Sequence, residues 1–264
     1  MMNRKNLILL CCGLLAFYGC KSVKQAESTS AITASDLTDR VWQLTEANGQ
    51  PVPEVVNGKI PHILLNSADA TISGNGGCNG MGGQFVVSKD NQIAFKGVFR
   101  TMMACPDMEV EDRLHKALQA ADNYTLQAGI LSLKKGTDET LARFKVASQA
   151  SLLQGQWVVN YVAGATTSFE ALYPDRKPFI LFQSVEKRAT GNTSCNNFSA
   201  TYTPDNSKLT FSPPISTRMA CKGDGERLFF EALRNVSAFS VSPDGKTLNL
   251  IAGDIAVMRL AKQY

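Results

Sequence analysis

The sequence predicts a β-rich α+β protein made of two tandem small antiparallel β-barrel-like domains, each with one packed α-helix. Three observations support this prediction: an internal repeat, many short apolar runs separated by turn formers, and one amphipathic helical segment in each copy. A parallel sheet would need a crossover helix between successive strands. Because each copy has only one helical segment, we expect an antiparallel sheet that is closed or nearly closed.

The chain repeats itself with an offset of 115 to 117 residues. The segment GNGGCNGMGGQF at residues 74–85 aligns with GNTSCNNFSATY at 191–202, and TMMAC at 101–105 aligns with TRMAC at 217–221. A leading tryptophan and a helical segment recur in the same order. Four landmarks in one order indicate that a unit has been duplicated.

Each copy begins with an apolar run that carries the tryptophan, which we expect to anchor the core. A second apolar run follows, and the Gly-Asn-Cys segment then leads into a third strand. An Asp-Asn turn separates this strand from a fourth. In copy one the expected strands are Val41–Leu44, which contains Trp42, then His62–Leu65, a strand ending at Val87, and Ile93–Phe95. In copy two they are Trp157–Val162, Phe179–Phe182, a strand ending at Tyr202, and Leu209–Phe211.

One helix and a closing hairpin complete each copy. An aspartate precedes each helix and is expected to cap it: Asp107 in copy one and Asp224 in copy two. After the second helix, alternating apolar residues flank an Asp244–Gly245 turn, as in a hairpin, and copy one has a matching pattern. The apolar helix faces are Val110, Leu114, Ala117, Leu118 and Ala121 in copy one and Leu228, Phe229, Ala232, Leu233 and Val236 in copy two.

The first twenty residues predict the compartment. Two basic residues precede an apolar stretch from Leu7 to Tyr18, which is too short to span a bilayer and is typical of a secretory signal peptide. Its end resembles the lipobox of bacterial lipoproteins, in which the cysteine, here Cys20, is acylated and becomes the mature N-terminus. Because Lys21 rather than aspartate follows, the resemblance implies an outer-membrane anchor facing the periplasm. The alternative is an ordinary secretory leader.

The net charge is small and does not indicate a partner. The chain has 27 basic and 23 acidic residues, and removal of the leader leaves 25 basic and 23 acidic residues. Without a dense stripe of lysine and arginine, nucleic acid is not expected as a partner. The predicted organisation is a lipoprotein signal peptide at 1–19, a polar tether at 20–36, one domain at 37–147 and a second at 151–264.

The odd number of seven cysteines is explained by the leader. Cys11 and Cys12 leave with the signal peptide, and Cys20 carries the lipid. An even number then remains in an oxidising compartment, which favours one disulfide in each copy, each worth about 3–4 kcal/mol. Free buried thiols and a redox pair are alternatives. No metal site is expected, because the cysteines lie in two separate copies. The four cysteines are Cys78 and Cys105 in copy one and Cys195 and Cys221 in copy two.

The combined motifs resemble the META domain, the family that includes the HslJ heat-shock proteins of bacterial envelopes. The resemblance rests on a leading tryptophan, Gly-x-x-(Gly/Ser)-Cys-Asn, Thr-x-Met-Ala-Cys, a helix and a final hairpin, and it covers both copies. Copy two departs by having Ser194 before Cys195. The resemblance implies an α+β or β-barrel-like fold and an envelope or stress association, without a catalytic residue. The motif residues, expected to be structural, are Gly74, Asn75, Asn79, Thr101, Met103, Ala104, Gly191, Asn192, Asn196, Thr217, Met219 and Ala220.

The sequence predicts neither a catalytic site nor a cofactor. The glycine-rich run of copy one fits neither the P-loop nor the dinucleotide template. The chain has two histidines, His62 and His115, both in copy one, so no Ser-His-Asp or Cys-His site is duplicated with the fold. Glu109, Glu111 and Asp112 are interpreted as an acidic helix start that favours the helix dipole.

The leading functional hypothesis is therefore a non-enzymatic envelope lipoprotein. It would serve as a binding or scaffolding module in stress tolerance, with a membrane anchor at Cys20 and an envelope protein as partner. One alternative is a lipocalin-like carrier that holds a small apolar ligand inside a barrel. Another is a protein inhibitor of an extracytoplasmic enzyme, acting through the segments Val52–Gly58 or Ala163–Phe169.

Overall fold

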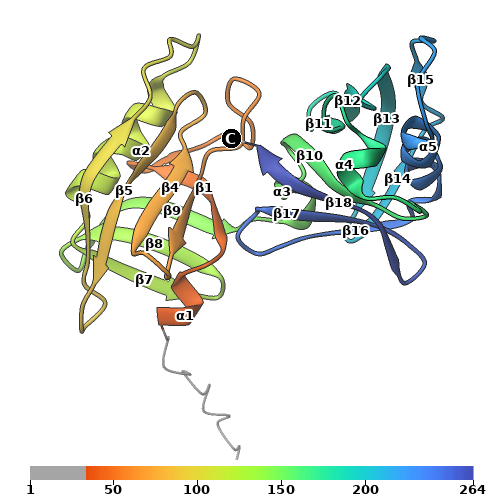
Figure 1. The fold of residues 1–264 in the computed structure, drawn as a ribbon. Helices are drawn as coiled ribbons and strands as arrows, with labels where there is room; N and C mark the ends of the chain where they lie inside the picture. The colour runs from red at the N-terminus through yellow and green to blue at the C-terminus, as the bar shows by residue number, and fades with distance from the viewer. Residues whose placement is uncertain (1–33, 264) are drawn as a thin grey trace, which may run out of the picture. The chain divides into compact units, whose positions relative to one another are not determined.

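The computed structural model describes residues 34–263, and the predicted signal peptide and Cys20 lie outside them. Each copy forms one antiparallel sheet with one long helix, as the sequence predicted (Figure 1). Within the described residues, no helix is both long and apolar enough to cross a membrane.

The sheet of copy one is an up-and-down meander in the order β6-β5-β4-β3-β1-β9-β8-β7, with β2 added to β1. Its first and last long strands, β1 and β9, pair with each other. The two edge strands of the sheet, β6 and β7, approach each other at an isolated bridge between Gln92, which precedes β6, and Asn123. The elements of copy one are α1 (Ala34–Leu37), β1 (Val41–Ala47), β2 (Gln50–Pro51), β3 (His62–Asn66), β4 (Thr71–Asn75), β5 (Gly80–Val87), β6 (Ile93–Arg100), α2 (Glu109–Ala120), β7 (Asn123–Gln127), β8 (Ile130–Lys135) and β9 (Glu139–Val146).

The sheet of copy two closes into an eight-stranded barrel. Its strands follow the order β12-β11-β10-β18-β17-β16-β14-β13, and β12 also pairs with β13, which completes the ring. The short β15 adds to β13. The elements of copy two are α3 (Gln149–Leu152), β10 (Gly155–Val162), α4 (Phe169–Leu172), β11 (Phe179–Gln183), β12 (Arg188–Asn192), β13 (Asn197–Asp205), β14 (Lys208–Phe211), β15 (Ile215–Ser216), α5 (Gly225–Asn235), β16 (Ala238–Val241), β17 (Thr247–Ala252) and β18 (Ile255–Gln263).

The long helix interrupts the meander at the same place in each copy. In copy one, α2 connects β6 to β7 and packs against β6, β1, β8 and β9; in copy two, α5 packs against β17, β10 and β18 (Figure 1). The predicted apolar faces of both helices are buried. The two predicted caps have different outcomes. Asp107 lies one residue before the N-cap, Met108, and its carboxylate accepts from the backbone N–H of Glu109, in the first turn of α2, at 3.0 Å. Asp224 stands at the N-cap, but its carboxylate accepts from Arg227 instead of a backbone N–H, so that prediction was wrong.

Each core is built around its tryptophan. Trp42 and Trp157 are fully buried, and each indole N–H donates to a backbone carbonyl, that of Leu37 at 2.8 Å and that of Leu153 at 2.7 Å. A buried indole N–H left without a partner would be costly, so this contact fixes the ring orientation. The expected core role of both tryptophans therefore agrees with the structure.

A lysine covers the tryptophan of copy two. The Lys262 Nζ lies 4.4 Å from the centre of the Trp157 ring. It donates to the carbonyl oxygen of Leu152 at 3.3 Å and to that of Gln154. Burial disfavours the charged ammonium and lowers the pKa of Lys262 to about 7.

Candidate functional site

The two disulfides occupy equivalent places in the copies. Cys78 is joined to Cys105 and Cys195 to Cys221, and the Cα atoms of each pair lie 5.9 Å apart. This is the pairing that the sequence favoured. Each bond ties the loop after β4 or β12 to the segment that precedes the long helix. The loop, the segment and the helix therefore form one unit in each copy.

An asparagine beside the first cysteine organises this unit in copy one. The Asn79 Oδ1 accepts from the Thr101 hydroxyl at 2.8 Å and from the backbone N–H of Met103 at 2.7 Å. Its Nδ2 donates to the Met103 carbonyl at 3.0 Å and to Glu111 Oε1 at 2.8 Å. All four hydrogen-bonding positions of the amide are satisfied. The Thr-x-Met spacing therefore places the Thr101 hydroxyl and the Met103 backbone where the amide of one buried asparagine can bind both.

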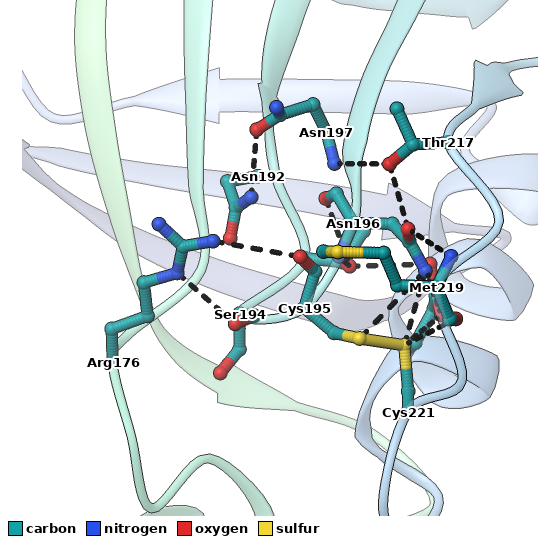
Figure 2. The surroundings of a disulfide bond; sticks show 11 residues. Arg176, Asn192, Ser194, Cys195, Asn196, Asn197, Thr217, Met219 and Cys221 are labelled. Atoms are coloured by element: carbon teal, nitrogen blue, oxygen red, sulfur yellow. Dashed lines mark hydrogen bonds between the residues drawn. A yellow bond between two sulfur atoms is a disulfide. The ribbon is translucent and has the colours of Figure 1, made fainter.

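Copy two repeats the arrangement with Asn196 (Figure 2). Its Oδ1 accepts from the Thr217 hydroxyl at 2.6 Å and from the Met219 backbone N–H at 2.8 Å. Its Nδ2 donates to the Met219 carbonyl at 3.1 Å and to Glu226 Oε2 at 3.0 Å. We call each set of residues the asparagine hub: Asn79, Thr101, Met103 and Glu111 in copy one and Asn196, Thr217, Met219 and Glu226 in copy two.

The glutamate of each hub was not predicted from the sequence. Glu111 is only 1% exposed, and its carboxylate accepts from the Asn79 backbone N–H at 2.6 Å as well as from the side chain. Arg100 lies 3.4 Å from the same carboxylate. The interpretation of Glu111 as a contribution to the helix dipole was therefore incomplete. The signal was present, because Glu111 and Glu226 align at the offset of 115 that also relates Trp42 to Trp157.

A basic side chain that binds the cysteine loop in each copy is a second feature that was not predicted from the sequence. Lys59 donates to the Cys78 carbonyl at 2.6 Å, and Arg176 donates to the carbonyls of Ser194 at 3.0 Å and Cys195 at 3.5 Å. Lys59 and Arg176 align at an offset of 117. Each copy therefore uses a long basic side chain to satisfy carbonyls of the loop.

The motif glycines allow two strands to approach each other. A Cβ added to Gly74 would lie 2.3 Å from the His62 carbonyl oxygen, and one added to Gly191 would lie 2.0 Å from that of Phe179. Beside them, the Asn75 side chain accepts from the Gly77 N–H at 2.7 Å. The side chain of Asn192 instead donates to that of Asn197 at 2.8 Å. The glycines thus have a duplicated steric role, whereas these two asparagines have different partners.

The segment held by each hub exposes apolar side chains. In copy one, Phe99, Met102 and Met103 are 63%, 98% and 51% exposed; in copy two, Ile215 and Met219 are 78% and 58% exposed. Phe99 aligns with Ile215, and Met103 aligns with Met219. Ala104 and Ala220 are also exposed. The hubs therefore fix the backbone of a segment whose side chains face solvent.

The remaining sequence candidates lie elsewhere. His62 begins β3, where its Nδ1 contacts the Ile60 carbonyl at 2.7 Å, and burial lowers its pKa. His115 lies on α2, four residues after Glu111. Buried side chains form one hydrophobic core in each copy, among them Phe144 in copy one and Phe182, Phe229 and Phe239 in copy two. The alternative of an apolar-ligand carrier stays a prediction.

The disulfides and the asparagine hubs act together as cross-links between segments of the chain. Both cysteine pairs are oxidised and the hub amides are saturated, so their hydrogen bonds join three segments of chain. Their combined effect is to hold an apolar segment at the surface in a fixed conformation.

Comparison with known proteins agrees with the duplication. The model of a family described as the META domain matches the chain twice, over residues 35–148 and 150–264. A comparison with curated proteins gives no match.

Three solved structures are similar to parts of the chain. One NMR structure is 24% identical and covers 44% of this chain and 95% of its own, with a TM-score of 0.36. An NMR structure of a protein from Burkholderia xenovorans is 21% identical and covers 47% and 99%, with a TM-score of 0.36. A crystal structure of a DUF4847 family protein from Bacteroides vulgatus is 16% identical and covers 41% and 92%, with a TM-score of 0.31.

Proposed function

From the premise that this chain belongs to the META domain family over both of its copies, we propose that it is a non-enzymatic binding module of the bacterial cell envelope. In this proposal the chain is anchored through a lipid on Cys20 to the outer membrane and faces the periplasm. It serves in envelope stress tolerance by binding another envelope protein through the segments that the hubs hold.

The exposed apolar side chains of these segments carry the proposal. Methionine and aromatic residues are enriched in the centres of protein interfaces, and methionine adapts to partners of different shape. Met103 and Met219 occupy equivalent places, and both are more than half exposed. A disulfide and a saturated amide hold each segment, so binding would cost little further ordering of the backbone. A protein partner fits this preorganised apolar surface.

Two observations support the compartment. The leader resembles that of a lipoprotein, and the two disulfides are of the kind that persists outside the cytoplasm. The anchor is tested separately from the binding. Replacement of Cys20 with alanine should release the protein from the membrane fraction, and mass spectrometry of the native protein should show a diacylglycerol on Cys20. An unmodified Cys20 would contradict the anchor alone.

The binding is tested by placing a photo-crosslinking amino acid at Met103 or Met219 in cells that produce the full chain. The matched control position is Val185, which is 65% exposed and lies outside both hub segments. We expect crosslinks to the same envelope protein from both hub positions and none to that protein from Val185.

A deletion strain provides the functional readout. We expect sensitivity to envelope stress, complemented by the wild-type chain and by a Val185→Asp variant, but not by a Met103→Asp, Met219→Asp double variant. Full complementation by the double variant, at equal protein level, would overturn the proposed binding surface.

A further inference from the structure

The disulfide of copy two has a carboxylate against one of its sulfurs. Glu226 Oε2 lies 2.6 Å from Cys221 Sγ, and Asn196 Nδ2 lies 3.1 Å from the same sulfur (Figure 2 shows the disulfide and Asn196). A disulfide sulfur has no proton to donate, whereas a thiol does. The position of Glu226 is therefore the one that would accept from a reduced Cys221.

Copy one lacks this contact because its glutamate has other partners. The Glu111 carboxylate accepts from the Asn79 backbone N–H and side chain and lies beside Arg100. In copy two, the corresponding backbone N–H of Asn196 donates to the Thr193 hydroxyl at 3.0 Å. Thr193 occupies the place of Gly76, which has no side chain. Thr193 therefore takes the backbone N–H of Asn196 and itself donates to Glu226 Oε1 at 3.3 Å, while Glu226 Oε2 faces the sulfur.

We propose that copy two contains a redox-gated metal site, formed by Cys195, Cys221 and Glu226 once the disulfide is reduced. Their ligand atoms all lie within 4.8 Å of one another. Two thiolates and a carboxylate suit a thiophilic divalent cation such as Zn²⁺ and leave a fourth position open. No metal site was predicted from the sequence, because the four cysteines lie in two separate copies. Here two cysteines of one copy gain a third ligand from helix α5.

Metal binding requires the two sulfur atoms to move apart. With metal–sulfur distances of about 2.3 Å in a tetrahedral site, the two sulfurs would be about 3.8 Å apart. The Cα atoms of Cys195 and Cys221 are 5.9 Å apart, which is compatible with this separation after side-chain rotation. Neither cysteine is fully buried, so both a reductant and a metal ion can approach.

The chemistry is a two-electron exchange followed by metal binding. A dithiol reductant attacks the disulfide, passes two electrons and two protons to Cys195 and Cys221, and is itself oxidised to a disulfide. The metal ion then displaces the two thiol protons and binds both thiolates and the Glu226 carboxylate. Oxidation of the two thiolates, with electrons passed to a disulfide oxidant, reverses the sequence and releases the metal.

The test uses the chain from residue 20 onward, with Cys20→Ala, reduced with a phosphine that does not supply thiols. Co²⁺ is the probe, since its thiolate complexes have charge-transfer absorption. We expect one Co²⁺ per chain after reduction and none in the oxidised protein. A Cys78→Ser, Cys105→Ser variant should retain this binding, and a Cys195→Ser, Cys221→Ser variant should lose it.

Glu226→Gln distinguishes the site from a mere pair of thiols. We expect it to weaken Co²⁺ binding at least 10-fold, while the matched Glu111→Gln leaves the affinity unchanged. Zn²⁺ should displace Co²⁺ and bleach the absorption. The proposal is overturned if the reduced Cys78→Ser, Cys105→Ser variant forms no stoichiometric complex, whether or not circular dichroism shows that variant to be folded. Equal binding by both cysteine pairs, or an unchanged affinity in Glu226→Gln, also overturns it.

Discussion

The carboxylate of Glu111 accepts hydrogen bonds from both the backbone N–H and the side-chain amide of Asn79, at 2.6 and 2.8 Å. The two residues are 32 positions apart in the sequence, and the contact joins helix α2 to the loop that carries Cys78. Both side chains are only 1% exposed. A polar pair buried to this degree contributes chiefly because either partner alone would be left unsatisfied.

Replacement of Asn79 with alanine should therefore be strongly destabilising. It removes four hydrogen bonds of the amide and leaves Glu111 Oε1 without its side-chain amide partner, although the backbone N–H of residue 79 is kept, for an expected loss of about 3 kcal/mol. Urea unfolding followed by the fluorescence of Trp42, in a Trp157→Phe background, reports copy one alone. The matched control is Gln127→Ala at an exposed strand end, expected to change stability by less than about 0.5 kcal/mol. Equal effects of the two substitutions would contradict this account.

Gly74→Ala tests the close approach of β3 and β4. The new Cβ would meet the His62 carbonyl oxygen at 2.3 Å, so the strands must separate, at a cost of about 1–3 kcal/mol. Gly80→Ala is the control, because a Cβ there has no atom within 4 Å. Calorimetric unfolding should show a lower melting temperature for Gly74→Ala than for Gly80→Ala. A tolerated Gly74→Ala would mean that the close approach is not needed.

Ser194→Gly should stabilise copy two. Ser194 has a φ of 82°, which is unfavourable for a residue with a side chain, and the aligned residue of copy one is Gly77 with a φ of 110°. We expect a gain of about 1 kcal/mol, measured by the fluorescence of Trp157 in a Trp42→Phe background. The reciprocal Gly77→Ser should be destabilising, since its Cβ would also lie 2.8 Å from the Val56 side chain. A loss of stability in Ser194→Gly would refute the argument from φ.

Lys262 should make the stability of copy two depend on pH. Its pKa is lowered by burial to about 7, from 10.5 in the unfolded chain. Between these values unfolding takes up a proton, so the wild-type free energy of unfolding rises with pH, by at most about 1.4 kcal/mol per pH unit. The advantage of a Lys262→Met variant should be largest below pH 7 and shrink up to pH 10.5. Urea unfolding across this range checks it, and parallel curves for the two proteins would contradict it.

Local patterns predicted the elements better than the contacts between them. The apolar faces of α2 and α5 and most strands follow from periodicity, and the cysteine pairing follows from the repeat. The final strands of the copies, β9 and β18, were not predicted, nor were β4 and β12. Strands β4 and β12 are short, contain a glycine and polar residues, and pair with their neighbouring strands through backbone hydrogen bonds.

The hub glutamates were missed for a different reason. Periodicity places Glu111 at the start of a helix, where an acidic residue already has a local explanation. Its actual partner, Asn79, is brought near only when α2 packs against the folded sheet. Lys59 and Arg176 share a role but not a residue type, so comparison of letters between the copies does not reveal them. In each case the offset between the copies was the available signal, and the contact itself required the fold.

The pairing of the first long strand with the last also bears on how such a chain arises. Trp42 lies opposite Val146, and Trp157 lies opposite Lys262, so each copy begins and ends at adjacent points. A gene segment that encodes such a unit can be copied in tandem with hardly any linker, because neither end has to cross the domain. For the same reason, each copy is a natural candidate for circular permutation: new ends at the loop before α2, with the old ends joined, would preserve every strand neighbour.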